Sequence, residues 1–110
     1  MAVSPPLELG MDRLGVLHTK VCNIYSEMVA NSKGYMNEIF KFNSTMSVKA
    51  KKEAISAARK CFESNERLRI EMEEAQKELR AVSNDVVKLI MEEQKDFIDQ
   101  LFNCDTTGGR

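Results

Sequence analysis

The sequence lacks glycine and proline over a long C-terminal stretch, since neither residue occurs between Gly34 and Gly108. These two residues most often end helices and form turns. In the same stretch, apolar and small residues recur in alternating steps of four and three, which is the period of one face of an α-helix. The pattern predicts one long helix of the coiled-coil type, over about residues 47–102. Its seam positions are Ala54, Ala58, Cys61, Asn65, Leu68, Met72, Ala75, Leu79, Val82, Val86 and Leu89.

The N-terminal part of the chain shows the same period in two shorter runs. One run covers residues 14–28 and the other residues 35–46, and the phase shifts by one residue between them. The tetrapeptide Asn-Ser-Lys-Gly at 31–34 separates the runs, and such residues favour turns and caps over helix interiors. A stutter inside one helix and a short break between two helices both fit this pattern. We predict an N-terminal helical segment over residues 5–46, with a break at 31–34 as an alternative.

A second polar cluster, at residues 43–47, separates the two helical halves. Three of its hydroxyls are candidate N-caps for the long helix, because a cap accepts a hydrogen bond from the first helical turn. The candidates are Ser44, Thr45 and Ser47. The predicted fold is therefore all-α. It is either an elongated helical hairpin that turns within this cluster, or a three-helix arrangement.

The helix start nearer the N-terminus has two candidates. Ser4 is followed by two prolines, which suit a first helical turn because the N–H that they lack would be unpaired there. Asp12 is the other candidate. The expected organisation is a flexible N-terminus over 1–4, the helical segment over 5–46, the heptad helix over 47–103 and a flexible tail over 104–110.

The length of the predicted long helix decides what must cover its seam. About 55 residues at about 1.5 Å each give a rod of roughly 80 Å. A compact chain of 110 residues has a radius of gyration of only about 13 Å. We expect the N-terminal heptads to pack against residues 65–80, and another chain to shield the rest. The apolar C-terminal end of the long helix then projects past its partner.

The seam is rich in alanine and cysteine, which bury little area, and burial contributes only ~25 cal/mol per Å². Asn65 at a seam position is a candidate for setting the register, and a solvated layer among polar neighbours is the alternative. Off-seam apolar residues widen the stripe after Val82, which fits a bundle of three or four helices. The residues that we expect to bind partner helices are Leu68, Met72, Leu79, Val82, Val86, Leu89, Ile90, Phe97 and Leu101.

The reactive residues form no enzyme motif. His18 is the one histidine, and Cys22 follows it on the same helical face, but a closed zinc site needs four ligands. Phosphate-binding, dinucleotide-binding and metalloprotease motifs are absent from the sequence. We therefore expect a non-enzymatic protein that uses no metal and no cofactor. The three cysteines, the lack of a signal-peptide pattern and the lack of an apolar run favour the cytoplasm, with the nucleus as an alternative.

The charges nearly cancel, because 16 Lys and Arg oppose 17 Asp and Glu. This balance gives no overall attraction to nucleic acid or to an anionic membrane. Basic residues gather at 49–60, but carboxylates lie among them, and we interpret this stretch as a solvated helix face. Nucleic acid is therefore not a favoured partner, and no transmembrane segment is expected.

These features together indicate an interaction protein. We expect a helical, coiled-coil subunit that mediates assembly of a larger intracellular complex of the adaptor, tethering or kinetochore kind. Such subunits are similar to this chain in size and heptads, and no specific motif extends the similarity. Hetero-oligomers are favoured over homo-oligomers, because the seam is too thin to associate strongly with itself. The alternative is a self-contained homo-oligomeric bundle that acts as a regulator or as a membrane-surface or nucleic-acid binder.

Overall fold

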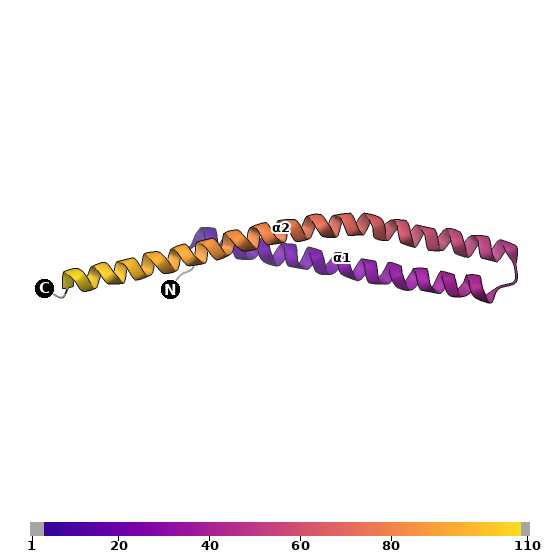
Figure 1. Ribbon diagram of the computed structural model, residues 1–110, viewed down its shortest axis with the longest axis horizontal. Coiled ribbons are helices and arrows are strands. Elements are labelled where there is room, and N and C mark those ends of the chain that lie inside the picture. Colours follow the sequence, from indigo (N-terminus) through magenta and orange to yellow (C-terminus); the bar gives the residue numbers. More distant parts are fainter. Residues whose placement is uncertain (1–3, 109–110) are drawn as a thin grey trace. The chain divides into compact units, whose positions relative to one another are not determined.

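The computed structural model describes the backbone of residues 4–108 and the side chains of residues 4–103. It contains two helices, α1 over Pro5–Ser44 and α2 over Val48–Gly108, joined by a three-residue turn (Figure 1). Within residues 4–108 there is no strand, so the all-α prediction is confirmed. Of the two arrangements that the sequence left open, the structure has two helices and not three over this range.

Serine caps begin both helices. Ser4 Oγ accepts a hydrogen bond from the Leu7 amide at 3.4 Å, and the two prolines occupy the first turn, where no N–H is needed. Ser47 caps α2, because its Oγ accepts from the Ala50 amide at 3.3 Å and its carbonyl accepts from the Lys51 amide at 3.0 Å. The structure therefore uses the earlier of the two N-terminal candidates and the last of the three candidates in the turn.

Helix α1 passes through residues 31–34 without interruption. Asn31 Nδ2 donates to Ser64 Oγ at 3.1 Å across the helix pair. Gly34 lies so close to α2 that an added Cβ would be 3.3 Å from Cys61 Sγ. Because these small and polar residues pack against α2, tertiary contacts override their preference for turns. The alternative of a break at 31–34 is therefore wrong.

The chain forms two compact units. Unit 2 is His18–Lys77, and unit 1 combines the residues up to Leu17 with those from Glu78 onward. Unit 2 is an antiparallel helical hairpin, because α1 leads into the turn and α2 leads back from it (Figure 1). Unit 1 pairs the first turns of α1 with the later part of α2.

The core of unit 2 joins Ile24 of α1 to Leu68 and Ala75 of α2, all of them buried. Three half-buried apolar residues pack at its edge, namely Val21, Met28 and Met72. Apolar burial between facing seams is the main term that stabilises such a pair. This cluster confirms that the N-terminal heptads cover this part of the long helix.

Unit 1 is stabilised by a close approach between the helices. Leu7, Leu17 and Val86 are buried in it. An added Cβ at Gly10 would lie 2.8 Å from Val86 Cγ2, so α2 occupies the space that any larger residue would need. At the surface of the same unit, Arg13 forms an ion pair with Glu78.

The eleven seam positions predicted for α2, from Ala54 to Leu89, are all buried or half-buried, while the coiled-coil type of packing stays a prediction. The end of the helix differs from the prediction. We expected α2 to end at about Asn103, but it extends to Gly108. The expected flexible ends at residues 1–3 and 109–110 lie outside the described residues.

Candidate interaction site

Asn65 lies half-buried between the two helices of unit 2. Its Nδ2 donates to Ser32 Oγ at 3.2 Å and to the Met28 carbonyl at 3.4 Å, while its Oδ1 is buried and accepts no hydrogen bond within the described part of the chain. A side-chain amide between two helices reaches its hydrogen-bond partners only in one alignment of the helices along their axes. It therefore favours that alignment over ones in which a helix is shifted along the other. This geometry suits a register-setting residue, and the role itself stays a prediction.

The predicted partner-binding residues fall into two groups. The first six of them lie on the seam and are buried or half-buried: Leu68, Met72, Leu79, Val82, Val86 and Leu89. Leu68 and Met72, for example, pack with α1 in the core of unit 2. The other three are exposed, with Ile90 at 37%, Phe97 at 45% and Leu101 at 52%. Only this second group lies open to another chain, and partner binding by any of the nine stays a prediction.

The exposed group borders a shallow groove of about 400 Å³ in unit 1. Leu7 is the one residue of α1 in its wall, and the other lining residues all come from α2. Further along α2 the apolar side chains stay largely uncovered, with Ile98 at 62% and Phe102 at 70% exposed. The C-terminal stretch of α2 therefore carries an apolar side that α1 does not cover.

Aromatic side chains lie outside the core. All seven Phe and Tyr residues belong to the described part of the chain, and none of them is buried. The buried apolar residues number eight, and three of these are alanines. Aromatic residues normally dominate cores because each can bury roughly 150–250 Å². The exposed ones here are Tyr25, Tyr35, Phe40, Phe62, Phe97 and Phe102.

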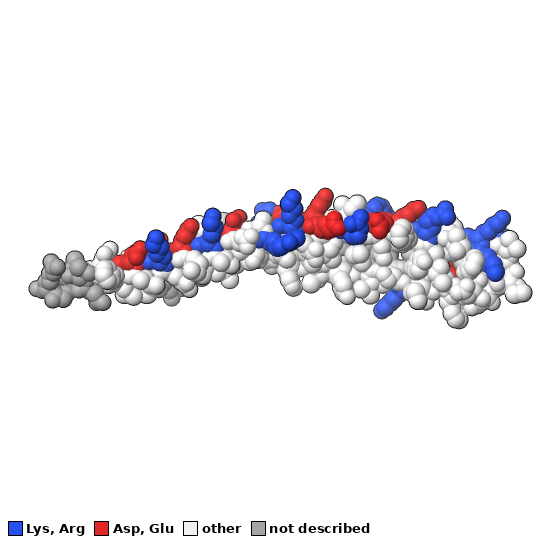
Figure 2. Space-filling model, viewed as in Figure 1, with Lys and Arg blue, Asp and Glu red and all other residues white. Residues whose placement is uncertain are grey.

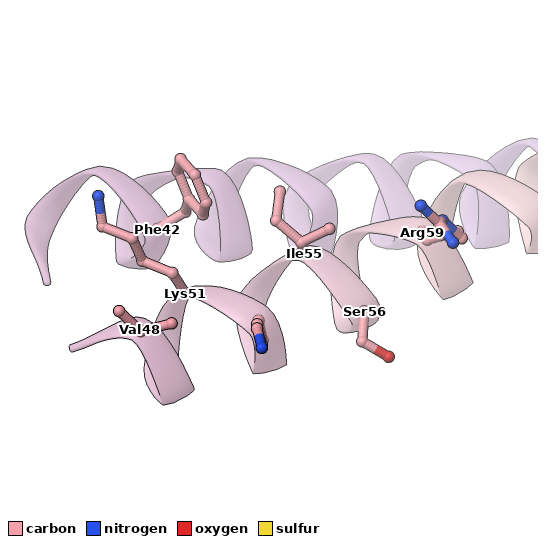
Figure 3. A pocket seen from close by; sticks show the side chains of 7 residues that line it. Phe42, Val48, Lys51, Ile55, Ser56 and Arg59 are labelled. Carbon is pink, nitrogen blue, oxygen red and sulfur yellow. The ribbon is translucent and has the colours of Figure 1, made fainter.

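A second groove, which we call the turn groove, lies beside the turn in unit 2 and has a volume of about 340 Å³ (Figure 3). Lys51 Nζ lies 5.0 Å from the centre of the Phe42 ring, which is a cation–π contact. Every charged residue of the lining is a cation. Its lining residues are Phe42 of α1 and Val48, Lys51, Lys52, Ile55, Ser56 and Arg59 of α2.

A third groove beside the same turn has a different lining. It contains both signs of charge, and Lys41 Nζ lies 3.1 Å from Glu38 Oε1 within it. Glu53 adds a second carboxylate. Cations without carboxylates are therefore a property of the turn groove and not of the whole turn region. In the view of Figure 2, charged side chains of both signs follow one edge of the surface, and much of the visible face is uncharged.

The turn groove is not predicted from the sequence, in which residues 49–60 indicate a solvated basic face. A usable signal is present, because Val48 and Ile55, which both line the groove, are seven residues apart and lie next to the seam. Phe42, from the other helix, could not be assigned to the groove without the pairing of α1 with α2.

The described residues contain no group of three or more His, Cys, Asp and Glu side chains that could hold a metal ion. The nearest approach is His18 Nδ1 with Cys22 Sγ, 3.9 Å apart and exposed. Cys61 is a half-buried free thiol, and the side chain of Cys104 lies outside the described residues. Neither helix, over its described residues, has the length of apolar sequence needed to span a bilayer.

Comparisons of this chain with protein-family models, with curated proteins and with solved structures give no match. The packing of α1 with α2 in each unit and the uncovered apolar surfaces are therefore the observations from which a function can be proposed.

Proposed function

We propose that this chain is a non-enzymatic helical subunit that helps to assemble a larger intracellular multiprotein complex, of the adaptor, tethering or kinetochore kind. Its seam pairs α1 with α2 in a coiled-coil manner, and its uncovered apolar side chains bind helices of other subunits. Other proteins are the favoured partners, so the complex is a hetero-oligomer. The residues that meet those partners in unit 1 are Ile90, Phe97 and Leu101.

One observation carries this proposal, namely the imbalance between covered and uncovered apolar side chains. Among residues 4–103, nineteen large hydrophobic residues are exposed, whereas the buried core holds eight apolar residues. Full burial of one such side chain is worth about 1.5–3 kcal/mol, so leaving many in water forfeits a large stabilisation. Extended apolar surfaces on a folded chain mark sites of association. Two helices have one shared seam, and a bundle of three or four helices would cover the flanking residues as well.

A second candidate is a homo-oligomeric bundle that acts as a regulator. The observation that favours it is the difference in charge between the turn groove and the C-terminal part of α2. Basic side chains line the groove, and carboxylates are frequent in the other region. Such a pair of surfaces can bind each other between copies of one chain.

The test of the assembly role is a double substitution, Phe97→Glu with Leu101→Glu. Both side chains are about half exposed, so the change should leave helicity by circular dichroism within about 10% of wild type while removing the apolar surface. We expect the tagged variant, isolated from its source cells after cross-linking, to lose subunits that co-purify with the wild type at fixed stoichiometry.

The matched control is Asn84→Glu with Gln100→Glu, which adds the same charge at two exposed polar positions of α2. It should keep the same subunits as the wild type. Retention of every subunit by the Phe97 and Leu101 variant would contradict the proposed contact, and a wild-type chain that purifies alone as a cooperative monomer would contradict the assembly role.

A further inference from the structure

The turn groove combines an apolar floor with cationic walls. Phe42 and Val48 supply apolar surface, and Val48 is 67% exposed. No carboxylate lines this groove among the described residues, and neither Lys52 nor Arg59 has an ion-pair partner there. The wider stretch 48–59 holds four Lys and Arg residues against the single carboxylate of Glu53. The turn groove is therefore complementary to an apolar surface that carries negative charge at its edges.

A segment with that chemistry exists in the same chain. We call residues 90–103 the tail segment, and it carries four carboxylates against the single cation of Lys95. Ile90 and Phe97 are seven residues apart, so they lie on one side of the helix, and both are exposed. Glu93 borders the same groove as Ile90 and Phe97, and Asp96 follows it three residues later, so these two carboxylates form an acidic row along one edge of that apolar side.

Both surfaces lie mainly on α2, because six of the seven groove residues and the whole tail segment belong to it. Every copy of the chain therefore carries both complementary surfaces, and a second copy is the occupant that supplies a tail segment to the groove.

We propose that the turn groove of one copy of this chain binds the tail segment of a second copy. The side chains of Ile90 and Phe97 of one molecule pack on Phe42, Val48 and Ile55 of the other. The acidic row of the tail segment then lies beside Lys52 and Arg59. This contact rests on the homo-oligomeric candidate above and names the residues through which two copies of the chain meet.

A charge-exchange experiment on the full chain tests the contact. The groove variant is Lys52→Glu with Arg59→Glu, and the tail variant is Glu93→Lys with Asp96→Lys. Lys52, Arg59 and Asp96 are exposed and Glu93 is half-buried, and none of the four belongs to the buried core, so circular dichroism should show wild-type helicity. In sedimentation velocity, we expect each variant alone to associate at least about tenfold more weakly than the wild type, because like charges then face each other.

The mixture of the two variants is the decisive sample. The acidic groove of one variant faces the basic tail of the other, and the reverse pair is complementary too. The mixture should therefore associate within about threefold of the wild type, and wild-type association should weaken as salt rises from about 50 to about 500 mM. The matched control is Lys60→Glu with Arg67→Glu, which removes two cations that line a different groove and should change association less than about twofold.

Several results would overturn the contact. A wild-type chain that stays monomeric up to about 100 μM in low salt, where attraction is strongest, has no such interface. Association that neither variant weakens, or a mixture that fails to recover, places the interface elsewhere. If the wild type is monomeric and binds phosphatidylserine vesicles, and the groove variant does not bind them, the groove is a lipid site instead. A groove variant that loses self-association but still co-purifies with the wild-type subunits leaves the assembly role intact, because its Ile90, Phe97 and Leu101 are unchanged.

Discussion

The two units hold the same pair of helices together by different means. In unit 2, Ile24, Leu68 and Ala75 form an apolar cluster, and a hydrogen-bonded layer around Asn65 follows it along the seam. In unit 1 the helices come close enough at Gly10 to exclude a Cβ, and no comparable polar layer is seen among the described residues.

This difference separates the stability of a helix pair from the alignment of its two helices. An apolar cluster supplies free energy but tolerates a shift of one helix along the other, because apolar contacts are not directional. A buried amide supplies little free energy and penalises a shift. We infer that the layer around Asn65 in unit 2 favours one alignment of α1 with α2. In unit 1, the close approach at Gly10 contributes tight packing.

The largest expected effect comes from truncating the apolar cluster. Ile24→Ala should lower the free energy of unfolding by about 2–4 kcal/mol, because it removes buried methyl groups and leaves a cavity against Leu68. Urea denaturation measures the loss, and hydrogen exchange locates it. Protection should fall more within residues 18–77 than in unit 1. The control Ile70→Ala alters a residue that is 51% exposed and should cost less than about 1 kcal/mol. An equal loss of protection in both units would remove the distinction between them.

A pair of glycine substitutions sharpens the comparison in unit 1. An added Cβ at Gly10 meets the stiff, buried Val86 at 2.8 Å, whereas one at Gly15 meets nothing within 4 Å. Gly15→Ala should therefore stabilise the chain by about 0.5–1 kcal/mol through helix propensity alone. Gly10→Ala should destabilise it by about 1–2 kcal/mol, because the helices must separate locally. Thermal melts of the two variants should move in opposite directions, and a shift in the same direction would mean that Val86 yields easily.

A smaller effect than that of Ile24→Ala, with the opposite sign, is expected at the polar layer. Asn65→Leu removes a buried acceptor without a partner and adds apolar surface, so it should stabilise the pair by about 1 kcal/mol, or about 4–8 °C in Tm. Analytical ultracentrifugation should also show more than one oligomeric species, because the register is no longer specified. Asn84→Leu, at an exposed position, is the control and should shift Tm little. An unchanged Tm for Asn65→Leu would mean that the layer is effectively solvated.

The sequence predicts the seam of α2 well because periodicity is a local property of one helix. All eleven seam positions face inward, and even the cap at Ser47 was among the candidates. The course of α1 was harder to predict. Asn31 and Gly34 have intrinsic turn preferences, and only their contacts with Ser64 and Cys61 explain why the helix continues. Those contacts depend on the offset of the two helices, which the pattern of a single helix does not contain.

The candidate site was predicted only in part, because some of its features depend on how the two helices pair. Ile90, Phe97 and Leu101 were identified because apolar residues leave the seam there, and they are exposed. Leu68 and Val86 were proposed to meet a partner, but their own chain buries them. The turn groove needs Phe42 from α1 beside Val48 and Ile55 from α2, so no reading of either helix alone could find it.

The three-residue turn between α1 and α2 also bears on how the chain folds. Closing so short a loop costs little entropy, so the pairing that begins beside Ser47 should form first and extend outward. Contacts such as Leu7 with the region of Ile90 join residues far apart in sequence and should form last. During synthesis the residues of the turn groove are also made before those of the tail segment, since they lie at 42–59 and 90–103. The order of synthesis and the order of pairing therefore run in the same direction, from the turn towards the C-terminus.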